Sequence, residues 1–277
     1  MSSPNDAQQH YWNEVAGPIW VQEKARLDRF SEPFLSAALR RLALEAGQSV
    51  LDVGCGTGAS TAALAERVGP SGRVLGVDIS RVMLDAAERA LASHANVQLR
   101  EEDAQTYRPE SSVDFVFSRF GVMFFADPRA AFENLGQGLR EGGQLGFLCW
   151  RGREDNEWAT FATEAAAEVI DVPTLDPAAP GPFRMARGGA TVELLIEAGF
   201  DDVGVEALDQ QVSFTLSDAN EFMTRVGPMA AFLREADETT AKALREALAS
   251  ALARRAQEGS VTFRAGAWWV SATRGEL

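Results

Sequence analysis

Residues 50–58 read VLDVGCGTG, and the segments on either side of this stretch decide the fold. A short apolar run, SVLDV at 49–53, precedes the glycines, and a helical pattern follows them to about Val68. Glycines at such a junction allow a tight turn and a close approach of the backbone to a ligand. The amides at the start of the helix then face that ligand. The stretch therefore predicts a strand, a glycine turn and a helix that bind a ligand together.

The alternation of strand and helix continues to about residue 151. Helices are expected at 82–93 and from Pro128 to about Leu139, with Asp127 as the N-cap of the second. Further strands are expected at 74–77, 97–100, 113–117, 144–150, 203–214 and 261–273. Short connections between alternating strands and helices are typical of a parallel sheet with helices on both faces. The chain is therefore predicted to have an α/β fold.

Composition excludes several classes of function. The 277 residues include 40 acidic and 26 basic side chains, for a formal charge of −14, which disfavours nucleic acid and anionic membrane surfaces as partners. Two cysteines and two histidines are too few for a zinc site, so no metal is expected. The N-terminus does not resemble a signal peptide, and no apolar stretch is long enough to span a membrane. We expect a cytoplasmic protein, with the oligomeric state, a homodimer included, left open.

Two aspartates decide which ligand suits the glycine turn. Asp78 ends the second strand, where a carboxylate can accept hydrogen bonds from a ribose diol. A dinucleotide-binding enzyme would use the same architecture, since Gly54, Gly56 and Ala59 satisfy the relaxed G-x-G-x-x-A pattern. Asp52, two residues before the first glycine, would repel a pyrophosphate by roughly a few kcal/mol. S-adenosylmethionine carries an ammonium and a sulfonium and no phosphate, so it suits this carboxylate better.

At these residues the sequence resembles the class I S-adenosylmethionine-dependent methyltransferases. Within that class it is similar to the C-methyltransferases of ubiquinone and menaquinone biosynthesis and to their small-molecule relatives. The resemblance covers about 48–151, with 261–273 as the expected last strand. It implies a doubly wound, mostly parallel seven-stranded sheet of the Rossmann-like methyltransferase type. It also implies methyl transfer from S-adenosylmethionine to a small, partly apolar acceptor, by C- or O-methylation of a quinol, phenol or natural product, with S-adenosylhomocysteine as the product.

The order of the predicted elements also divides the chain into parts. A single domain is expected over 1–277, because no linker separates independent halves. Its parts are an N-terminal helical lid at 1–47 and a cofactor-binding core at 48–151. An insertion or second lid follows at 152–190, where a proline-rich stretch interrupts the alternation. The C-terminal part of the sheet, with added helices, would occupy 191–277.

Cofactor-binding roles follow from the resemblance, residue by residue. Asp52 would lie near the methionine amino group, and Asp78 would hold the ribose hydroxyls. The methionine and sulfonium end would be lined by Gly54, Gly56, Thr57 and Gly58, and the adenine by Ile79, Met83, Asp103 and Ala104.

Arg119 departs from the pattern of the quinone enzymes, which more often have a small polar residue before the Phe120-Gly121 pair. A guanidinium beside the substrate suits a carboxylate or another anion, so Arg119 is counted with both the cofactor-binding and the catalytic residues. His10 and Tyr11 are the other catalytic candidates, as general bases. The candidate substrate-binding residues are Tyr11, Trp20, Phe120 and Phe124.

Each of these features also has a purely structural explanation, and two other functions stay open. The glycines could form only a tight turn, Asp78 could cap the next helix, and the aromatic side chains could belong to the core. A nicotinamide-dependent oxidoreductase could use the same fold, although Asp52 and Gly58 disfavour it. A non-catalytic protein that binds S-adenosylmethionine would carry the same residues as the enzyme.

Overall fold

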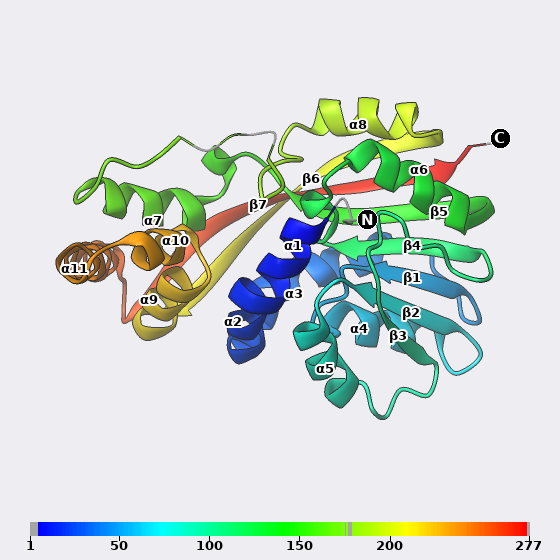
Figure 1. Cartoon of the computed structure of the whole chain (residues 1–277), viewed down its shortest axis with the longest axis horizontal. Helices are drawn as coiled ribbons and strands as arrows, with labels where there is room; N and C mark the ends of the chain where they lie inside the picture. The colour runs from blue at the N-terminus through cyan, green and yellow to red at the C-terminus, as the bar shows by residue number, and fades with distance from the viewer. Residues whose placement is uncertain (1–4, 175, 177–178, 276–277) are drawn as a thin grey trace.

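A seven-stranded mixed sheet forms the centre of the computed structural model, which describes residues 5–174, 176 and 179–275. The strand order is β3-β2-β1-β4-β5-β7-β6, and every neighbouring pair is parallel except those that involve β7. Figure 1 shows the sheet, whose strands are β1 (Ser49–Val53), β2 (Arg73–Asp78), β3 (Val97–Glu101), β4 (Val113–Arg119), β5 (Leu139–Trp150), β6 (Phe200–Thr215) and β7 (Ser260–Arg274). The predicted doubly wound, mostly parallel α/β fold is confirmed.

β1 lies at the point where the strand order reverses. All five of its residues are buried, which explains a continuous apolar run rather than an alternating one. It pairs with β2 on one side, from Ser49 opposite Arg73, and with β4 on the other. Open α/β sheets bind ligands in the crevice beyond the carboxyl ends of the strands at such a point. The fold therefore places the ligand site at the end of β1.

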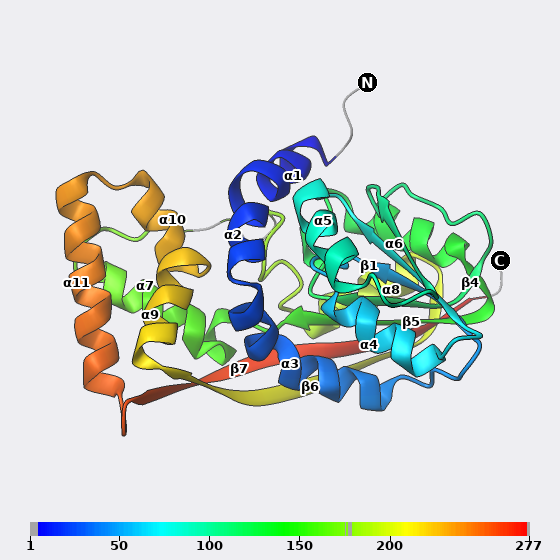
Figure 2. The same ribbon diagram turned by 90° about the horizontal axis from the view of Figure 1, so that it is seen from below.

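Helices cover both faces of the sheet, as the alternation predicts. α3 (Lys24–Arg41), α4 (Ala59–Val68) and α5 (Arg81–Ala90) lie on one face, and α6 (Pro128–Gly138) and α8 (Gly188–Glu197) lie on the other (Figures 1 and 2). α6 begins as expected, because the Asp127 carboxylate accepts a hydrogen bond from the Ala130 amide at 3.1 Å and Pro128 occupies the first turn.

A helical lobe, α7 (Glu157–Ala167) with α9 (Leu216–Arg225), α10 (Pro228–Glu235) and α11 (Glu238–Arg255), lies beside the sheet (Figure 2). The β6–β7 ribbon extends beyond the other strands, and α9, α10 and α11 of the lobe connect its two strands. Leu244, Leu248 and Leu252 are buried along one face of α11, in agreement with their spacing of four. The lobe combines residues that the sequence assigns to two separate parts, because α7 packs against α10 and α11 rather than forming a separate insertion.

The N-terminal segment lies between the sheet and the lobe (Figures 1 and 2). It consists of α1 (Asp6–His10), a π-helical turn η1 (Tyr11–Val15) and α2 (Ala16–Gln22), and it leads into α3. Two 3₁₀ turns, η2 (Val122–Phe124) and η3 (Arg153–Asp155), follow β4 and β5. In the described part of the chain, no helix is both long and apolar enough to cross a membrane.

Candidate functional site

A cavity of about 480 Å³ lies at the carboxyl ends of the strands, within the usual size of a small-molecule site. Its walls come from the sheet edge, the N-terminal helices and the helical lobe. The predicted cofactor-binding residues that line it are Gly54, Gly56, Thr57, Asp78, Ile79, Met83, Asp103, Ala104 and Arg119. Asp52 and Gly58 are not among the described residues of the wall.

The glycine loop can hold its shape only with glycine. Gly54 and Gly56 have φ angles of +65° and +56°, which side chains rarely adopt. A Cβ at Gly54 would lie 2.9 Å from the Cα of Gly121, so the loops after β1 and β4 touch through their backbones. Gly58 has a different role, because a Cβ there would meet Leu91 at 2.8 Å. Gly58 therefore allows α4 to approach α5, and it is not among the described residues of the cavity wall.

Asp78 joins the ends of β1 and β2. Its Oδ2 accepts a hydrogen bond from the Gly56 amide at 2.8 Å, and its Oδ1 accepts one from the Ser80 amide at 2.9 Å. Burial raises the pKa of this carboxyl, while the backbone donors oppose that shift. Each oxygen keeps a lone pair, so the carboxylate can still accept hydrogen bonds from a diol. Ser80 caps α5 in place of Asp78, accepting from the Met83 amide at 3.3 Å.

Asp52 lies behind the glycine loop rather than in the cavity wall. The side chain is fully buried, and its Oδ2 accepts hydrogen bonds from Ser60 Oγ at 2.8 Å and Thr61 Oγ1 at 2.7 Å. Its Oδ1 has no hydrogen-bond partner among the described residues. Burial raises the pKa of Asp52 to about 6 against the two hydroxyl donors. The sequence placed the Asp52 carboxyl beside the ligand, whereas in the structure the backbone of the glycine loop lies between this carboxyl and the cavity.

Two asparagines join the N-terminal segment to the loops that carry the predicted ribose and adenine residues. Asn5 Nδ2 donates to both carboxylate oxygens of Asp103, at 2.9 and 2.8 Å, and its Oδ1 accepts from the Ala126 amide at 2.8 Å. Asn13 Nδ2 donates to the Ile79 carbonyl at 3.2 Å. Sequence reasoning missed both asparagines, since an isolated polar residue in a helical segment has no distinguishing pattern.

Arg119 ends β4 and reaches the cavity with its charge already compensated. Its guanidinium lies 3.8 Å from an Asp28 carboxylate oxygen and donates to the Ser31 hydroxyl, both on α3. Burial lowers the pKa of Arg119, and the charges of Asp28 and Asp52 oppose that shift. Arg119 therefore lines the cavity, but its guanidinium is bound by this chain's own side chains.

The predicted aromatic residues meet on the cavity wall. Trp12 makes edge contacts with Tyr11, Trp20 and Phe124, with ring centroids 5.2–5.5 Å apart. Phe120 stacks on Trp150 at 4.0 Å and has a φ of +64°, an unusual angle for a residue with a side chain. All four candidate substrate residues line the cavity. His10 is exposed and is not among the described residues of the wall, so it is not placed to act there as a base.

A second group of rings, which we call the aromatic chamber, continues the cavity into the lobe. Phe30 lies 5.6 Å from both Trp150 and Trp158 and 4.9 Å from Phe222, and Phe183 lies 6.0 Å from Trp158. These five rings come from segments far apart in the chain, and no spacing in the sequence joins them.

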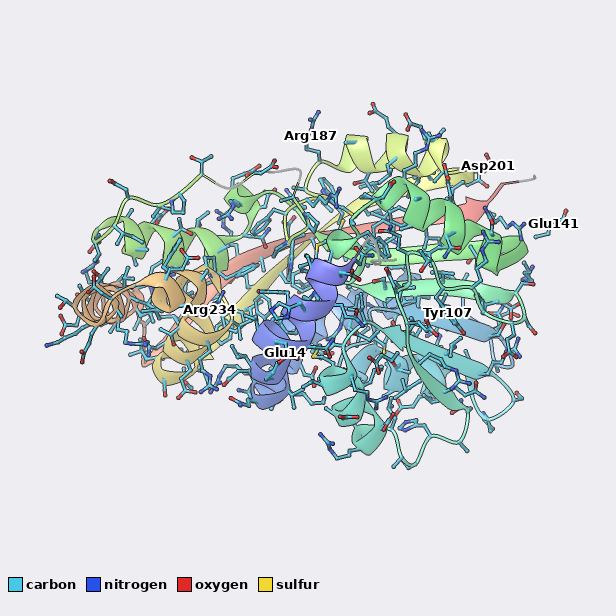
Figure 3. The ribbon with its side chains drawn as sticks, in the orientation of Figure 1. Glu14, Tyr107, Glu141, Arg187, Asp201 and Arg234 are labelled. Atoms are coloured by element: carbon cyan, nitrogen blue, oxygen red, sulfur yellow. The ribbon has the colours of Figure 1, made fainter. Side chains whose placement is uncertain are left out.

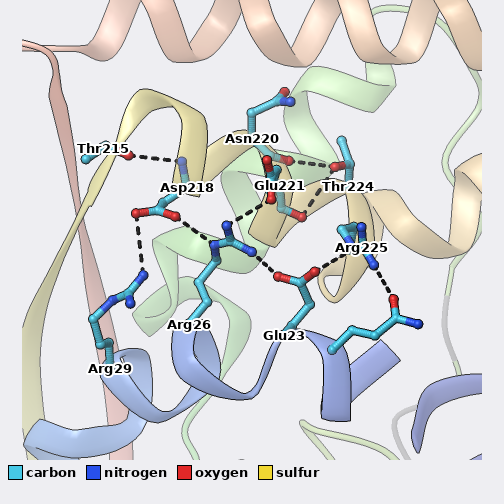
Figure 4. A network of polar contacts seen from close by, with 10 residues as sticks. Glu23, Arg26, Arg29, Thr215, Asp218, Asn220, Glu221, Thr224 and Arg225 are labelled. Atoms are coloured by element: carbon cyan, nitrogen blue, oxygen red, sulfur yellow. Dashed lines mark hydrogen bonds and ion pairs between the residues drawn. The ribbon is translucent and has the colours of Figure 1, made fainter. Parts of the chain in front are cut away.

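An ionic network fixes the lobe to the N-terminal helices (Figure 4). Arg26 on α3 pairs with Glu23 and, at 2.9 Å each, with Asp218 and Glu221 on α9. Arg225 pairs with Glu23 at 2.7 Å, and the Glu23 side chain is only 6% exposed. Charge pairs that share a buried carboxylate are screened less than surface pairs. The network therefore holds together the two elements that enclose the aromatic chamber.

Comparison with known proteins identifies the core. Residues 50–143 match the family described as a methyltransferase domain. A demethylmenaquinone methyltransferase of Lactobacillus johnsonii is 35% identical over 114 residues, which cover 39% of this chain and 46% of that protein. The enzyme of the same name from Staphylococcus aureus is 36% identical over 108 residues, which cover 39% of this chain and 45% of that protein. The chain thus matches about half the length of these curated relatives.

Solved structures share the fold over most of the chain. The YcgJ protein of Bacillus subtilis superposes with a TM-score of 0.58 at 15% identity, over 88% of this chain and 98% of that one. Phosphoethanolamine N-methyltransferase 2 of Haemonchus contortus, solved with S-adenosylmethionine, superposes with a TM-score of 0.58 at 19% identity. The match covers 100% of this chain and 61% of that one. The core is a class I methyltransferase domain, the family for which S-adenosylmethionine is typical. Antiparallel β7 between β5 and β6 also differs from the all-parallel dinucleotide-binding order.

Proposed function

We propose that this protein transfers a methyl group from S-adenosylmethionine to a small, partly apolar acceptor, by C- or O-methylation of a quinol, phenol or natural-product type. One observation carries the proposal: the glycine loop, Asp78 and the aromatic chamber line the same cavity. A cofactor at the strand ends and an acceptor among the rings would therefore meet without crossing solvent. A purely structural glycine turn would not need such an arrangement.

The residues at the strand ends fit the cofactor. Gly54 and Gly56 leave the backbone uncovered, and a Cβ at Gly56 would press on Met83 Cε at 3.1 Å. Asp78 offers lone pairs for the ribose, and Ile79 and Met83 offer an apolar surface for the adenine. When bound, S-adenosylmethionine supplies an electrophilic methyl group on a positively charged sulfur.

This chain's own residues would then hold the acceptor and exclude water. Alignment of two reactants can lower a barrier by about 7–11 kcal/mol, and the aromatic walls provide such alignment. Of the two proposed bases, Tyr11 lines the cavity and His10 does not. We retain Tyr11 as the candidate base, whose hydroxyl would take the acceptor's proton while giving its own proton to water. Arg119, next to the site, would reach a developing oxyanion only by giving up part of its contact with Asp28 and Ser31.

We further propose that the N-terminal segment acts as a lid. It lines the cavity through Trp12 and Trp20, and Asn5 and Asn13 bond it to the loops on which the cofactor would rest. Movement of a lid of this kind would admit both reactants and then exclude water. The helical lobe, rather than residues 152–190 alone, would form the opposite wall.

The test is release of S-adenosylhomocysteine by the full chain from S-adenosylmethionine and a panel of phenols, quinols and aromatic carboxylic acids. We expect binding of the cofactor by calorimetry and product release with at least one acceptor. Cofactor binding with no release for any acceptor would favour the non-catalytic alternative. Binding of NADH with no binding of S-adenosylmethionine would overturn the proposal in favour of an oxidoreductase.

A further inference from the structure

We propose, on the basis of the function above, that the acceptor carries an oxyanion, a carboxylate or phosphate, on an aromatic or otherwise apolar body, and that Arg153 binds this oxyanion. Arg153 lies in η3, directly after β5, and lines the cavity. Its guanidinium lies over the ring of Phe183, 4.9 Å from the centroid. The structure therefore places a cation and an aromatic surface together at the lobe end of the cavity.

Arg153 differs from the neighbouring cations because its charge is not compensated. Within the described ranges, its side chain makes no ion pair and no hydrogen bond, and it is only partly exposed. The nearby acid Asp155 pairs with Arg151 at 2.8 Å instead. Burial lowers the pKa of Arg153, and no acidic group opposes that shift. A half-buried guanidinium that no carboxylate of the described chain engages is free to form charge-assisted hydrogen bonds with an anionic ligand.

The other cations of the wall have partners or lie in solvent. Arg119 has Asp28 and Ser31, Arg225 has Glu23 at 2.7 Å, and Lys24 also pairs with Asp28. Arg234, on the side of α10 toward α2 (Figure 3), lines the cavity but is exposed, so water weakens its attraction for an anion. Arg153 is thus the best-placed anion site in the described wall.

Charge is unevenly distributed along the cavity. The ends of β2 and β3 contribute the acids Asp78, Glu102 and Asp103, whereas the cations come from β4, η3, α3 and the lobe helices α9 and α10. A further acid of the wall, Asp28 on α3, pairs with two of these cations, Lys24 and Arg119. A cofactor with an ammonium and a sulfonium suits the acidic end. An anionic acceptor suits the opposite end, although the chain as a whole has a formal charge of −14. The two reactants would therefore be sorted to opposite ends by charge.

The aromatic chamber defines the rest of the acceptor. Trp158 and Phe183, with centroids 6.0 Å apart and planes at 27°, offer stacked surfaces beside the guanidinium. Phe120 and Trp150 lie on the way to the strand ends. A flat apolar acceptor packed against the rings of the chamber would have its oxyanion at Arg153 and its nucleophilic atom toward the glycine loop. Arginine suits this position better than lysine, since its planar fork makes two parallel hydrogen bonds.

Binding of matched probes tests the inference without methyl transfer. The full chain, saturated with S-adenosylhomocysteine, is titrated calorimetrically with 2-naphthoate, 2-naphthyl phosphate and the neutral 2-naphthalenemethanol. We expect one anion or both to bind more tightly than the alcohol, and the tighter one identifies the source of the oxyanion. In Arg153→Gln the affinity of that anion should fall roughly ten- to hundredfold, with the alcohol nearly unchanged. The affinity of Arg153→Lys for that anion should lie between those of the parent and Arg153→Gln, since lysine keeps the charge but not the planar fork.

Two further variants control for charge and position. Arg89→Gln removes the charge of an exposed arginine on α5, away from the cavity, and should leave all three affinities unchanged. Arg234→Gln should have a much smaller effect than Arg153→Gln. The inference is overturned if the anions bind no better than the alcohol, or if Arg234→Gln rather than Arg153→Gln removes the preference. If Arg153→Gln does not fold, normal anion binding by Arg153→Lys would overturn it equally.

The same titrations separate this inference from the proposed function. S-adenosylhomocysteine binding is measured first on every variant, and Arg153→Gln should retain it. Normal cofactor binding and turnover together with unselective probe binding would contradict the oxyanion site alone. Selective, Arg153-dependent probe binding without turnover of any acceptor would contradict the methyltransferase proposal and leave the site in place.

Discussion

Replacing Gly54 by alanine tests whether the glycine loop is shaped for a ligand or only for a turn. The variant meets two obstacles. Alanine at a φ of +65° costs about 1–2 kcal/mol, because the left-handed region is unfavourable for a residue with a Cβ. The new Cβ would also lie 2.9 Å from the Cα of Gly121, a backbone atom that cannot move alone.

The two costs add to a loss of about 2–5 kcal/mol in the free energy of unfolding, since overpacking against backbone costs about 1–3 kcal/mol. Gly121 follows Arg119 and Phe120, so its displacement would move the cavity wall with it. A shift of this kind should weaken S-adenosylhomocysteine binding by roughly tenfold or more. A variant with this loss should still fold, because domains have about 5–15 kcal/mol of stability.

The matched control is Gly199→Ala. Gly199 has a φ of +85°, and among the described residues no heavy atom lies within 4 Å of the Cβ that alanine would add. It should lose only the backbone cost of about 1–2 kcal/mol and bind the ligand normally. Urea unfolding gives the stabilities, and calorimetry gives the affinities. Equal losses in the two variants, or normal ligand affinity in Gly54→Ala, would refute the reasoning.

Three further substitutions probe the site. Burial raises the pKa of Asp52 from its ordinary value of 3.8 to about 6 in the folded chain, so its contribution to stability is present below the ordinary value and is lost as the pH rises through 6. Asp52→Asn should therefore gain roughly 2–3 kcal/mol relative to the parent between pH 4 and pH 7 in urea unfolding, and parallel pH profiles would contradict this. Phe120→Gly should be about 1 kcal/mol more stable than Phe120→Ala, since only glycine accommodates the φ of +64° without strain; the reverse order would exclude strain there. Asn5→Ala should lose about 1–3 kcal/mol and speed hydrogen exchange over residues 6–22, because Asp103 and the Ala126 amide lose a partner; unchanged exchange would mean that Asn5 does not fix the segment.

The fold could be predicted because its signals are local. The buried strand 49–53, the glycines that follow it and the Asp127-Pro128 helix start each depend on residues next to one another. Side-chain direction at the site could not be predicted as well. Asp52 and Gly58 are both near the ligand in sequence, yet Asp52 faces α4 through Ser60 and Gly58 faces α5. Position in a motif fixes the backbone path and leaves open which side of the loop a residue faces.

The aromatic chamber could not be predicted from local sequence signals. Its rings come from α3, β5, α7, α9 and the segment before α8, and they meet only because the β6–β7 ribbon carries the lobe back over the strand ends. Each ring taken alone predicts burial, which is the usual fate of Phe and Trp. The shared wall depends on tertiary packing between segments as distant as Phe30 and Phe222, which no periodicity encodes.

The arginines show why contacts rather than positions decide function. Arg119 is the natural anion-binding candidate in the sequence, because it directly follows a strand beside the ligand site. In the folded chain, its guanidinium already contacts Asp28 and Ser31, on a helix about 90 residues earlier in the sequence. Arg153 has no distinguishing motif, yet it lines the cavity with its guanidinium over the Phe183 ring and, in the described part of the chain, without an acidic partner. A charge with a protein partner adds to stability, and a charge without one is available to a ligand; this distinction appears only once the distant segments are packed together.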